Sequence, residues 1–403
     1  MPLRRTTHWP AMMRAIVRSS AILASLFPCL FPFIIRAQEV PDLQITSKRY
    51  IVIDADTGEV FAQRAAHQEV AMASLTKVFT TIEALERGNL DQVITTDDSD
   101  VFDPQSSTVM GFGSGESFTL RDLLYGMMLP SGNDAAHAVA RALGYENGDS
   151  DSKAVSHFVD EMNERIRDMG LTETHLVRPD GWGVKGHYSS AHDLAVFTMY
   201  ALKYPMFVDL ISTAQYTTSD GSYTVTNTNK MLNTYQDLVG GKTGYDDDAG
   251  YCLIEVARRN GNTMISVTLD GVAPDDWYDD DRVLLDYAFE QKEARVANKR
   301  PITGEVVGFR DPDAARIEAQ ATPGASFGSP RSSGTPAPSP VADSEAGPLI
   351  QTPAPASESA GTGALDRFDG KLLVAVAVTG IVIVAGVLGS VIGGSTTTRK
   401  RPD

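Results

Sequence analysis

The sequence predicts an α+β domain in which a helical portion is inserted into a mostly antiparallel sheet. Three observations point to this fold: short apolar runs early in the domain, a long block of helical periodicity, and a strong hairpin signal followed by a closing helix. Early and late strands separated by helices are typical of one α+β domain. We therefore expect one folded domain over residues 39–300.

The domain should begin with a hairpin and a helix. Residues 49–54 and 60–63 are short apolar runs on either side of the turn tripeptide Asp-Thr-Gly at 56–58, which is a β-hairpin pattern. A helix over residues 73–87 follows, because apolar residues recur there at helical spacing and Gly88-Asn89 can end it.

The middle of the domain is predicted to be helical and its end to return to strands. Helical patterns cover residues 120–128, 134–143, 155–169 and 191–202. Strands are expected at 251–258 and 263–269, because the Asn260-Gly261 pair between them favours a two-residue hairpin turn. A helix over residues 280–290 closes the domain.

The N-terminal residues 1–37 have the pattern of a secretory signal peptide. Four arginines precede an apolar run over 21–35, and Ala37 offers a small residue at a cleavage site. An uncleaved anchor is the alternative interpretation. A lipoprotein signal at Cys29 is less consistent with the sequence, because Pro28 stands where a small residue should precede the cysteine.

The C-terminal part predicts a tether and a membrane span. Residues 301–370 are rich in Pro, Ala, Ser, Gly and Thr, a composition typical of disordered spacers. Residues 371–394 form a transmembrane helix in this interpretation, since the stretch 372–393 is apolar and uncharged and has about the length that crosses a bilayer. Three basic residues in the tail 395–403 place that tail in the cytoplasm and the domain outside.

Charge and cysteine content exclude several functions. The formal net charge of −17 argues against nucleic acid and anionic lipid surfaces as partners. The chain has two cysteines, Cys29 and Cys252; the first lies in the predicted signal peptide, so no internal disulfide is expected. The histidines do not pair as H-x-x-x-H on a helix, so we expect neither a metal nor another cofactor.

Three short motifs carry the predicted chemistry. Residues 74–77 read S-x-x-K at a helix start, residues 131–133 read S-x-N in a turn before a helix, and residues 242–244 read K-T-G on an apparent strand. In this order they are a signature of serine β-lactamases and penicillin-binding proteins. A second S-x-x-K, at 150–153, and a G-x-S-x-G at 324–328 lie in polar or low-complexity stretches and are attributed to chance.

The spacing of the first motif assigns a nucleophile and its base. Residues i and i+3 share a helix face, so the Lys77 amine can reach the Ser74 hydroxyl. A serine is a weak nucleophile until a neighbour takes its proton. Lys77 can take it if burial and the Lys242 charge lower the Lys77 pKa. Ser131 is the candidate relay to the leaving group.

The remaining candidates bind substrate. Asn133 can hold a substrate amide, and Lys242 and Thr243 offer a cation and a hydroxyl to a substrate carboxylate. Gly244 completes this motif. Backbone N–H groups of Ser74 and Tyr245 are the candidate oxyanion hole.

Over about residues 50–289 the chain resembles the low-molecular-mass penicillin-binding proteins of the D-alanyl-D-alanine carboxypeptidase type. Besides the three motifs, the segments 123–129, 134–136, 162–163 and 189–194 are similar to the sequences of this family. The resemblance implies a β-lactamase/transpeptidase-like fold and no metal. It further implies that an acyl-enzyme at Ser74 removes the terminal D-alanine from peptidoglycan stem peptides, and that β-lactam antibiotics inhibit it.

Alternatives remain beside this resemblance. A serine β-lactamase is one, although the E-x-x-L-N segment of the related lactamases is missing; a D,D-endopeptidase and a catalytically silent wall-binding protein are others. Many relatives carry a β-rich second domain where this chain has the tether. The aspartates at 246–248 and between 275 and 281 are expected to be solvated, with an acidic rim for substrates or cations as the alternative.

Four further residues are expected to have structural roles. His137 should pack or cap rather than act as a base, and Cys252 should be a buried strand residue. Trp182 and Trp277 are expected to be core or loop anchors.

Overall fold

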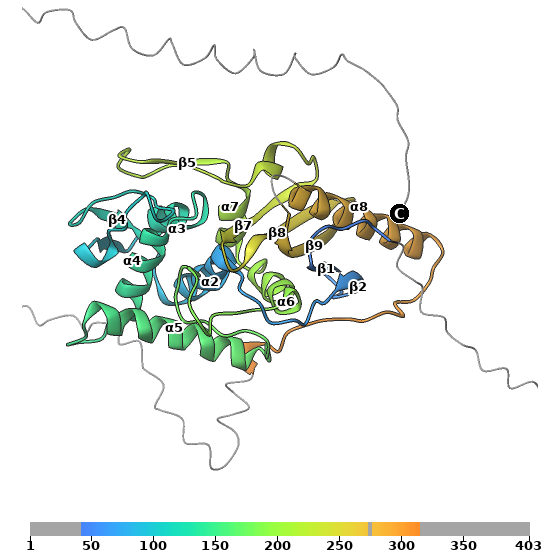
Figure 1. Cartoon of the computed structure of the whole chain (residues 1–403), viewed down its shortest axis with the longest axis horizontal. Coiled ribbons are helices and arrows are strands. Elements are labelled where there is room, and N and C mark those ends of the chain that lie inside the picture. Colours follow the sequence, from blue (N-terminus) through green and yellow to red (C-terminus); the bar gives the residue numbers. More distant parts are fainter. Residues whose placement is uncertain (1–41, 273–275, 315–403) are drawn as a thin grey trace, which may run out of the picture. The chain divides into compact units, whose positions relative to one another are not determined.

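The computed structural model describes residues 42–272 and 276–314, which contain a five-stranded sheet flanked by helices (Figure 1). The strand order is β2-β1-β9-β8-β7, and every neighbouring pair is antiparallel. The sheet thus joins strands from both ends of the domain, with the helices between them in sequence, as the sequence predicts.

Both predicted hairpins are present. β1 (Arg49–Asp54) pairs with β2 (Val60–Arg64), and β8 (Gly250–Arg259) pairs with β9 (Asn262–Gly271). The turn between β8 and β9 has positive φ at Asn260 and Gly261, the conformation that this residue pair favours. β7 (Leu238–Asp246) forms an edge of the sheet and carries the K-T-G motif.

The two faces of the sheet are buried by different helices (Figure 1). Because side chains alternate along a strand, Val52 and Leu253 pack with α8 (Asp276–Ala297) on one face. Ile51 and Ile254 pack on the other face, in the core that includes α2 (Lys77–Arg87) and α6 (Ala191–Ala201). This second, larger core supports the motifs.

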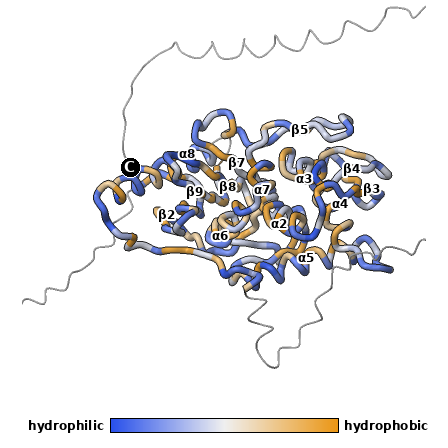
Figure 2. Tube along the Cα trace, turned by 180° about the vertical axis from the view of Figure 1, so that it is seen from behind, coloured by the Kyte–Doolittle hydropathy of each residue, from blue (hydrophilic) through white to orange (hydrophobic). Residues whose placement is uncertain are grey.

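The helical portion between β2 and β7 contains the remaining helices. They are α3 (Leu120–Met128), α4 (Asn133–Gly144), α5 (Asp151–Asp168) and α7 (Pro205–Ser212). Figure 2 shows hydrophilic and hydrophobic residues interspersed along α5, as in a helix with one buried apolar face. The buried side of α8 also contains charged residues, among them Asp281 and Lys292.

Short elements were not expected from the sequence. They are two small hairpins, β3 (Val93–Thr95) with β4 (Ser117–Thr119) and β5 (Gln215–Thr217) with β6 (Thr224–Thr226), the helix α7, and three 3₁₀ turns, η1 (Ala73–Thr76), η2 (Asp98–Asp100) and η3 (Lys230–Asn233). Strands of three residues are too short to produce a readable alternation.

Two expectations about the C-terminal part need correction. Asp280 and Asp281 are buried in α8 and accept hydrogen bonds, Asp281 from Ser266 and Thr268 at 2.5 and 2.6 Å, so they are not solvated loop residues. Ordered packing also continues past residue 300, where the tether was expected to start, because Val307 is buried against the core.

Four predicted segments lie wholly or mostly outside the described residues. They are the signal peptide 1–37, most of the tether 301–370, the membrane helix 371–394 and the tail 395–403. In the described part of the chain, no single helix is long and apolar enough to cross a bilayer, and only α6 with α7, bent by 115°, passes that test as a pair.

Candidate active site

The S-x-x-K motif lies where a 3₁₀ turn runs into a helix. The sequence predicts one helix from residue 73, but Ser74 lies in η1 and Lys77 is the first residue of α2. Ala73 has φ of 49°, so the chain is tightly turned just before Ser74. The Lys77 Nζ nevertheless lies 2.8 Å from the Ser74 Oγ, as the i, i+3 spacing predicts.

Lys77 is fully buried and has three hydrogen-bond acceptors. Its Nζ donates to Ser74 Oγ, to Asn133 Oδ1 at 2.6 Å and to the Asp180 carbonyl at 2.9 Å. Burial lowers the Lys77 pKa to about 8, and the negative charges of Asp180 and Asp134 oppose that shift. Burial is the main cause of the lowered pKa, as predicted, but the positive charge that adds to it is that of Arg178 and not that of Lys242.

The second motif contacts the third across the site. Ser131, with φ of 63°, ends the turn before α4, and its Oγ accepts a hydrogen bond from Lys242 Nζ at 2.9 Å. Lys242 lies on β7 and also donates to the Thr243 carbonyl at 2.7 Å. Burial, with the nearby Lys77 charge as a second cause, holds the Lys242 pKa well below its usual value.

Asn133 and Thr243 are held by partners that the sequence did not single out. The Asn133 Nδ2 donates to Ser107 Oγ at 2.9 Å, while its Oδ1 accepts from Lys77. The Thr243 Oγ1 lies 2.7 Å from Thr228 Oγ1. Neither Ser107 nor Thr228 belongs to a motif, so no local pattern could identify them.

Gly244 brings the β7 backbone against the nucleophile turn. A Cβ at Gly244 would lie 3.0 Å from the Met72 carbonyl oxygen and 3.2 Å from the Ser74 nitrogen, so a larger residue would push the strand away. The next residue, Tyr245, is 52% exposed. Its ring packs on Tyr251 with centroids 4.6 Å apart, which leaves its side chain at the rim of the site.

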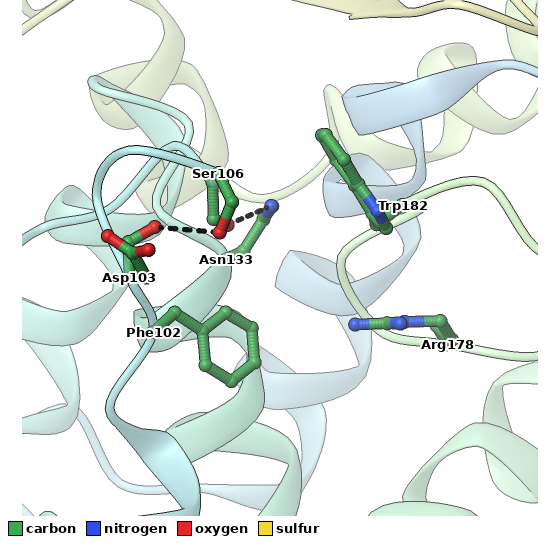
Figure 3. A pocket seen from close by; sticks show the side chains of 7 residues that line it. Phe102, Asp103, Ser106, Asn133, Arg178 and Trp182 are labelled. Atoms are coloured by element: carbon green, nitrogen blue, oxygen red, sulfur yellow. Dashed lines mark hydrogen bonds between the residues drawn. The ribbon is translucent and has the colours of Figure 1, made fainter.

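A pocket of about 370 Å³ adjoins this network (Figure 3). It is lined by Phe102, Asp103, Ser106, Ser107, Asn133, Arg178 and Trp182. Asn133 belongs to both the pocket and the Lys77 network, so the pocket opens next to the nucleophile. Trp182 is 45% exposed, which corrects the expectation that it anchors a core or loop.

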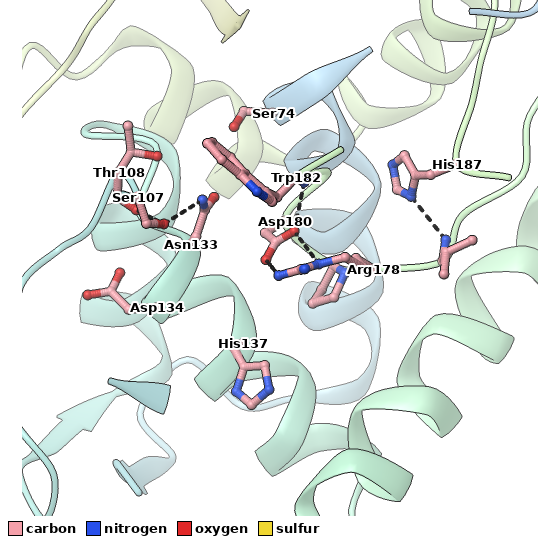
Figure 4. A network of polar contacts seen from close by, with 12 residues as sticks. Ser74, Ser107, Thr108, Asn133, Asp134, His137, Arg178, Asp180, Trp182 and His187 are labelled. Carbon is pink, nitrogen blue, oxygen red and sulfur yellow. Dashed lines mark hydrogen bonds and ion pairs between the residues drawn. The ribbon is translucent and has the colours of Figure 1, made fainter. Parts of the chain in front are cut away.

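The segment that carries Asp180 and Trp182 packs tightly on the nucleophile turn (Figure 4). Asp180 Oδ2 pairs with Arg178 Nη2 at 2.8 Å, and its Oδ1 accepts from the Trp182 amide. Gly181 has φ of +82°, and a Cβ there would lie 2.0 Å from the Ala73 carbonyl oxygen. This contact explains why only glycine fits between the two segments.

Asp246, which was expected to be solvated, is instead buried at the end of β7 and accepts hydrogen bonds from the Asp248 and Ala249 amides. His137, Trp277, Cys252 and the second S-x-x-K have the expected structural roles. The chance S-x-x-K is an ordinary surface site, in which Lys153 pairs with Asp149 at 2.7 Å. His137 Nδ1 contacts Asp100 at 2.8 Å, and Trp277 is buried. Cys252 is buried in β8, and burial raises its thiol pKa to about 12, so it is not a reactive thiol.

Comparisons with known proteins identify the family of the chain. Residues 35–273 match the family described as D-alanyl-D-alanine carboxypeptidase. The chain is 31% identical to D-alanyl-D-alanine carboxypeptidase DacB2 of Mycobacterium tuberculosis, over 63% of this chain and 86% of the relative. It is 29% identical to D-alanyl-D-alanine carboxypeptidase DacF of Bacillus subtilis, over 64% of this chain and 66% of the relative.

The fold is similar to that of a solved relative. The crystal structure of the Streptomyces K15 DD-transpeptidase aligns with a TM-score of 0.57 at 31% identity, over 61% of this chain and 98% of the relative. The sheet order, the contacts among the three motifs and the family match lead to the same assignment: the chain belongs to the D-alanyl-D-alanine carboxypeptidase family of serine peptidases.

Proposed function

We propose that this protein removes the terminal D-alanine from peptidoglycan stem peptides through an acyl-enzyme at Ser74. The observation that carries the proposal is the 2.8 Å contact between Ser74 Oγ and the buried Lys77 amine, whose pKa is lowered to about 8. A neutral amine at that distance can take the serine proton as the hydroxyl attacks a carbonyl carbon.

The first half-reaction forms an ester. Ser74 Oγ bonds to the carbonyl carbon of the penultimate residue while its proton moves to Lys77. The C–N bond to the terminal D-alanine then breaks, and the leaving amine receives a proton through Ser131, which already accepts a hydrogen bond from Lys242. In the second half-reaction, water hydrolyses the ester and restores Ser74.

The K-T-G strand is proposed to recognise the substrate. Lys242 is buried with little compensating charge, which lowers its pKa. A substrate carboxylate beside it would supply that charge and favour its protonated form. The Thr243 hydroxyl would bind the same carboxylate. The backbone of β7 next to Ser74, with the Tyr245 and Ser74 amides as donors, would hold the developing oxyanion.

An assay of released D-alanine tests the proposal. Full-length protein mixed with a pentapeptide that ends in D-Ala-D-Ala should release one D-alanine per peptide. Ser74→Ala should abolish both this release and covalent labelling by a fluorescent penicillin. Ser150→Ala, in the chance S-x-x-K, is the matched control and should behave like the parent. Full labelling of the Ser74→Ala protein would show that the nucleophile is another residue.

The lactamase alternative predicts different penicillin kinetics. In a penicilloyl-enzyme the leaving group stays tethered and blocks water, and the chain lacks the E-x-x-L-N glutamate that activates this water in the related lactamases. We therefore expect intact-protein mass spectrometry to show an adduct that decays over minutes or longer. Rapid, repeated hydrolysis without an accumulating adduct would support the lactamase instead.

We also propose that the enzyme acts outside the cytoplasmic membrane, anchored by one C-terminal span. The proposal rests on the uncharged stretch 372–393 followed by the basic residues Arg399, Lys400 and Arg401. An extracytoplasmic domain would be on the side of the membrane where peptidoglycan is found.

A further inference from the structure

Three potential metal ligands converge away from the motifs. His67, Glu173 and His192 each offer one ligand atom, and these atoms lie within 4.8 Å of one another. His67 Nδ1 is 2.9 Å from Glu173 Oε1, and His192 Nδ1 is 3.9 Å from Glu173 Oε2. Donors around a tetrahedral zinc ion are about 3.3 Å apart, so ligand atoms that lie up to 4.8 Å apart would have to move slightly closer to bind one ion.

The side chains of this cluster are already oriented. The imidazole rings of His67 and His192 stack with centroids 4.4 Å apart. Glu173 Oε2 accepts a hydrogen bond from Ser190 Oγ at 2.6 Å, and His192 Nδ1 lies 2.9 Å from Asp193 Oδ1, so the Nε2 of His192 is the nitrogen that can bind an ion while this contact persists. Such supporting contacts hold imidazole and carboxylate ligands in place in metal sites.

A further carboxylate contacts the other ring nitrogen of His67. Glu305 Oε1 is 3.8 Å from His67 Nε2, and its other oxygen accepts a hydrogen bond from Gln63 at 2.6 Å. Together with Glu173 and Asp193, it gives the cluster three carboxylates beside two imidazoles. These carboxylates give the cluster negative charge that a divalent cation would neutralise in part.

We propose that His67, Glu173 and His192 bind a divalent transition-metal ion, preferably zinc, with water as the fourth ligand. Two imidazoles and a carboxylate are a ligand set that zinc and its neighbours in the first transition row accept, whereas calcium and magnesium prefer oxygen alone. The sequence argued against a metal because no H-x-x-x-H occurs, but these ligands come from separate segments of the chain.

The ion would act structurally rather than in the reaction. Glu173 and His192 stand at the two ends of a segment whose middle brings the Asp180 carbonyl to Lys77 and Trp182 to the pocket. His67 precedes the nucleophile turn, and Glu305 belongs to the segment that follows α8. An ion bound by His67, Glu173 and His192 would therefore link the chain before the nucleophile turn to both ends of that segment, with Glu305 in contact with His67.

A second cluster in the described residues is a weaker candidate. It contains Glu146, Asp149 and His157, and so offers a single imidazole. Its Asp149 already pairs with Lys153 at 2.7 Å, which reduces the charge left for an ion. It is a useful control, because metal that binds non-specifically to surface carboxylates and histidines should bind at this cluster as well.

Titration of chelator-treated, full-length protein with Co²⁺ and Zn²⁺ tests the proposal. We expect one ion per chain, visible ligand-field bands with Co²⁺, and a rise in Tm of about 5–10 °C at a hundredfold excess over Kd. His67→Gln and His192→Gln should each weaken binding at least tenfold, since even the loss of an outer-shell partner costs about that much.

Two variants serve as matched controls. His175→Gln changes an exposed histidine on the same segment, and His157→Gln changes the second cluster; both should bind like the parent. The absence of binding by the parent, or loss of binding in His157→Gln alone, would overturn the proposal. If the cluster variants do not unfold cooperatively, the anomalous signal of zinc in parent crystals decides whether the ion lies among these ligands.

Discussion

Lys77 is surrounded by three acceptors, and this arrangement decides how it can act as a base. A protonated amine can donate to Ser74, Asn133 and the Asp180 carbonyl at once. A neutral amine keeps two N–H groups for Asn133 and Asp180, and its lone pair is then free to point at Ser74. The fixed acceptors therefore orient the base for proton transfer.

The rate of acylation should depend on pH through this amine. Because the Lys77 pKa is about 8, the neutral fraction rises about tenfold per pH unit below 8 and levels off above it. We expect penicillin acylation rates to follow that curve, and Lys77→Ala to lower the rate at least ~10²-fold. Lys153→Ala, the control, should change neither the acylation rate nor its dependence on pH. A pH-independent rate between 6 and 9 would contradict the assignment of Lys77 as base.

At the level of chain segments, the stretch from Arg178 to Trp182 constrains the site most strongly. Its backbone touches the nucleophile turn at Gly181, where a Cβ would also lie 2.4 Å from Thr76 Oγ1. That hydroxyl already bonds to the Ala73 carbonyl and contacts His187. A side chain at Gly181 would therefore have to displace either η1 or the segment itself.

Substitution of Gly181 can distinguish the effect of a steric clash from the effect of backbone strain at positive φ. Gly181→Ala should lower the acylation rate at least tenfold and reduce Tm, because the added methyl group meets backbone atoms. Gly186→Ala is the matched control, since Gly186 has a similar φ of +88° but a Cβ there would meet only Val177 Cγ2, at an ordinary contact distance of 4.0 Å. It should lose only about 1–2 kcal/mol from the positive φ. Equal loss of acylation in both variants would mean that strain alone matters.

The contact between α8 and the sheet contains two buried acids whose pKa is raised. Burial raises the Asp281 pKa to about 8, against the hydrogen bonds from Ser266 and Thr268. Glu255 on β8 is also buried, and burial together with the Asp281 charge holds its pKa well above the usual value. Both acids bind more protons in the folded than in the unfolded chain, so stability falls as pH rises from about 4 to 8.

Neutralising one of these acids should flatten this dependence. Asp281→Asn removes a group whose ionisation opposes folding, and an amide can still bond to both hydroxyls. We expect its Tm to fall less than that of the parent between pH 5 and 9, and to exceed the parent value at pH 9. Asp280→Asn is the control: Asp280 accepts four hydrogen bonds from Thr46 and Ser47, so its loss should destabilise the fold throughout. A steeper fall for Asp281→Asn would contradict this account.

For the whole molecule, the proposed membrane anchor can be tested independently of the catalytic residues. The folded core and the catalytic contacts lie within residues 42–314, so truncation after about residue 365 removes the apolar stretch and leaves the domain intact. We expect this protein to be soluble and to release D-alanine like the full-length protein, as measured after fractionation of membranes. Truncated protein that stays with membranes would mean that the N-terminal signal is retained or that another segment binds.

Local patterns in the sequence were sufficient to predict most of the fold. Apolar alternation and the Asn260-Gly261 turn predicted β8 and β9, and helical periodicity predicted α2 to α6 within a few residues. These signals are readable because each arises from neighbours in the chain. The spacing of Ser74 and Lys77 likewise predicted their contact, since one turn brings residues i and i+3 together.

Tertiary structure alone decided the rest, because the remaining contacts join residues far apart in the chain. No local pattern could indicate that the Asp180 carbonyl accepts a hydrogen bond from Lys77, or that His67 lies beside His192. Burial is also a property of the packed chain, and it sets the lowered pKa of Lys77 and the raised pKa of Asp281. The sequence by itself determined the fold class and the motif residues, while packing decided their partners and their charge.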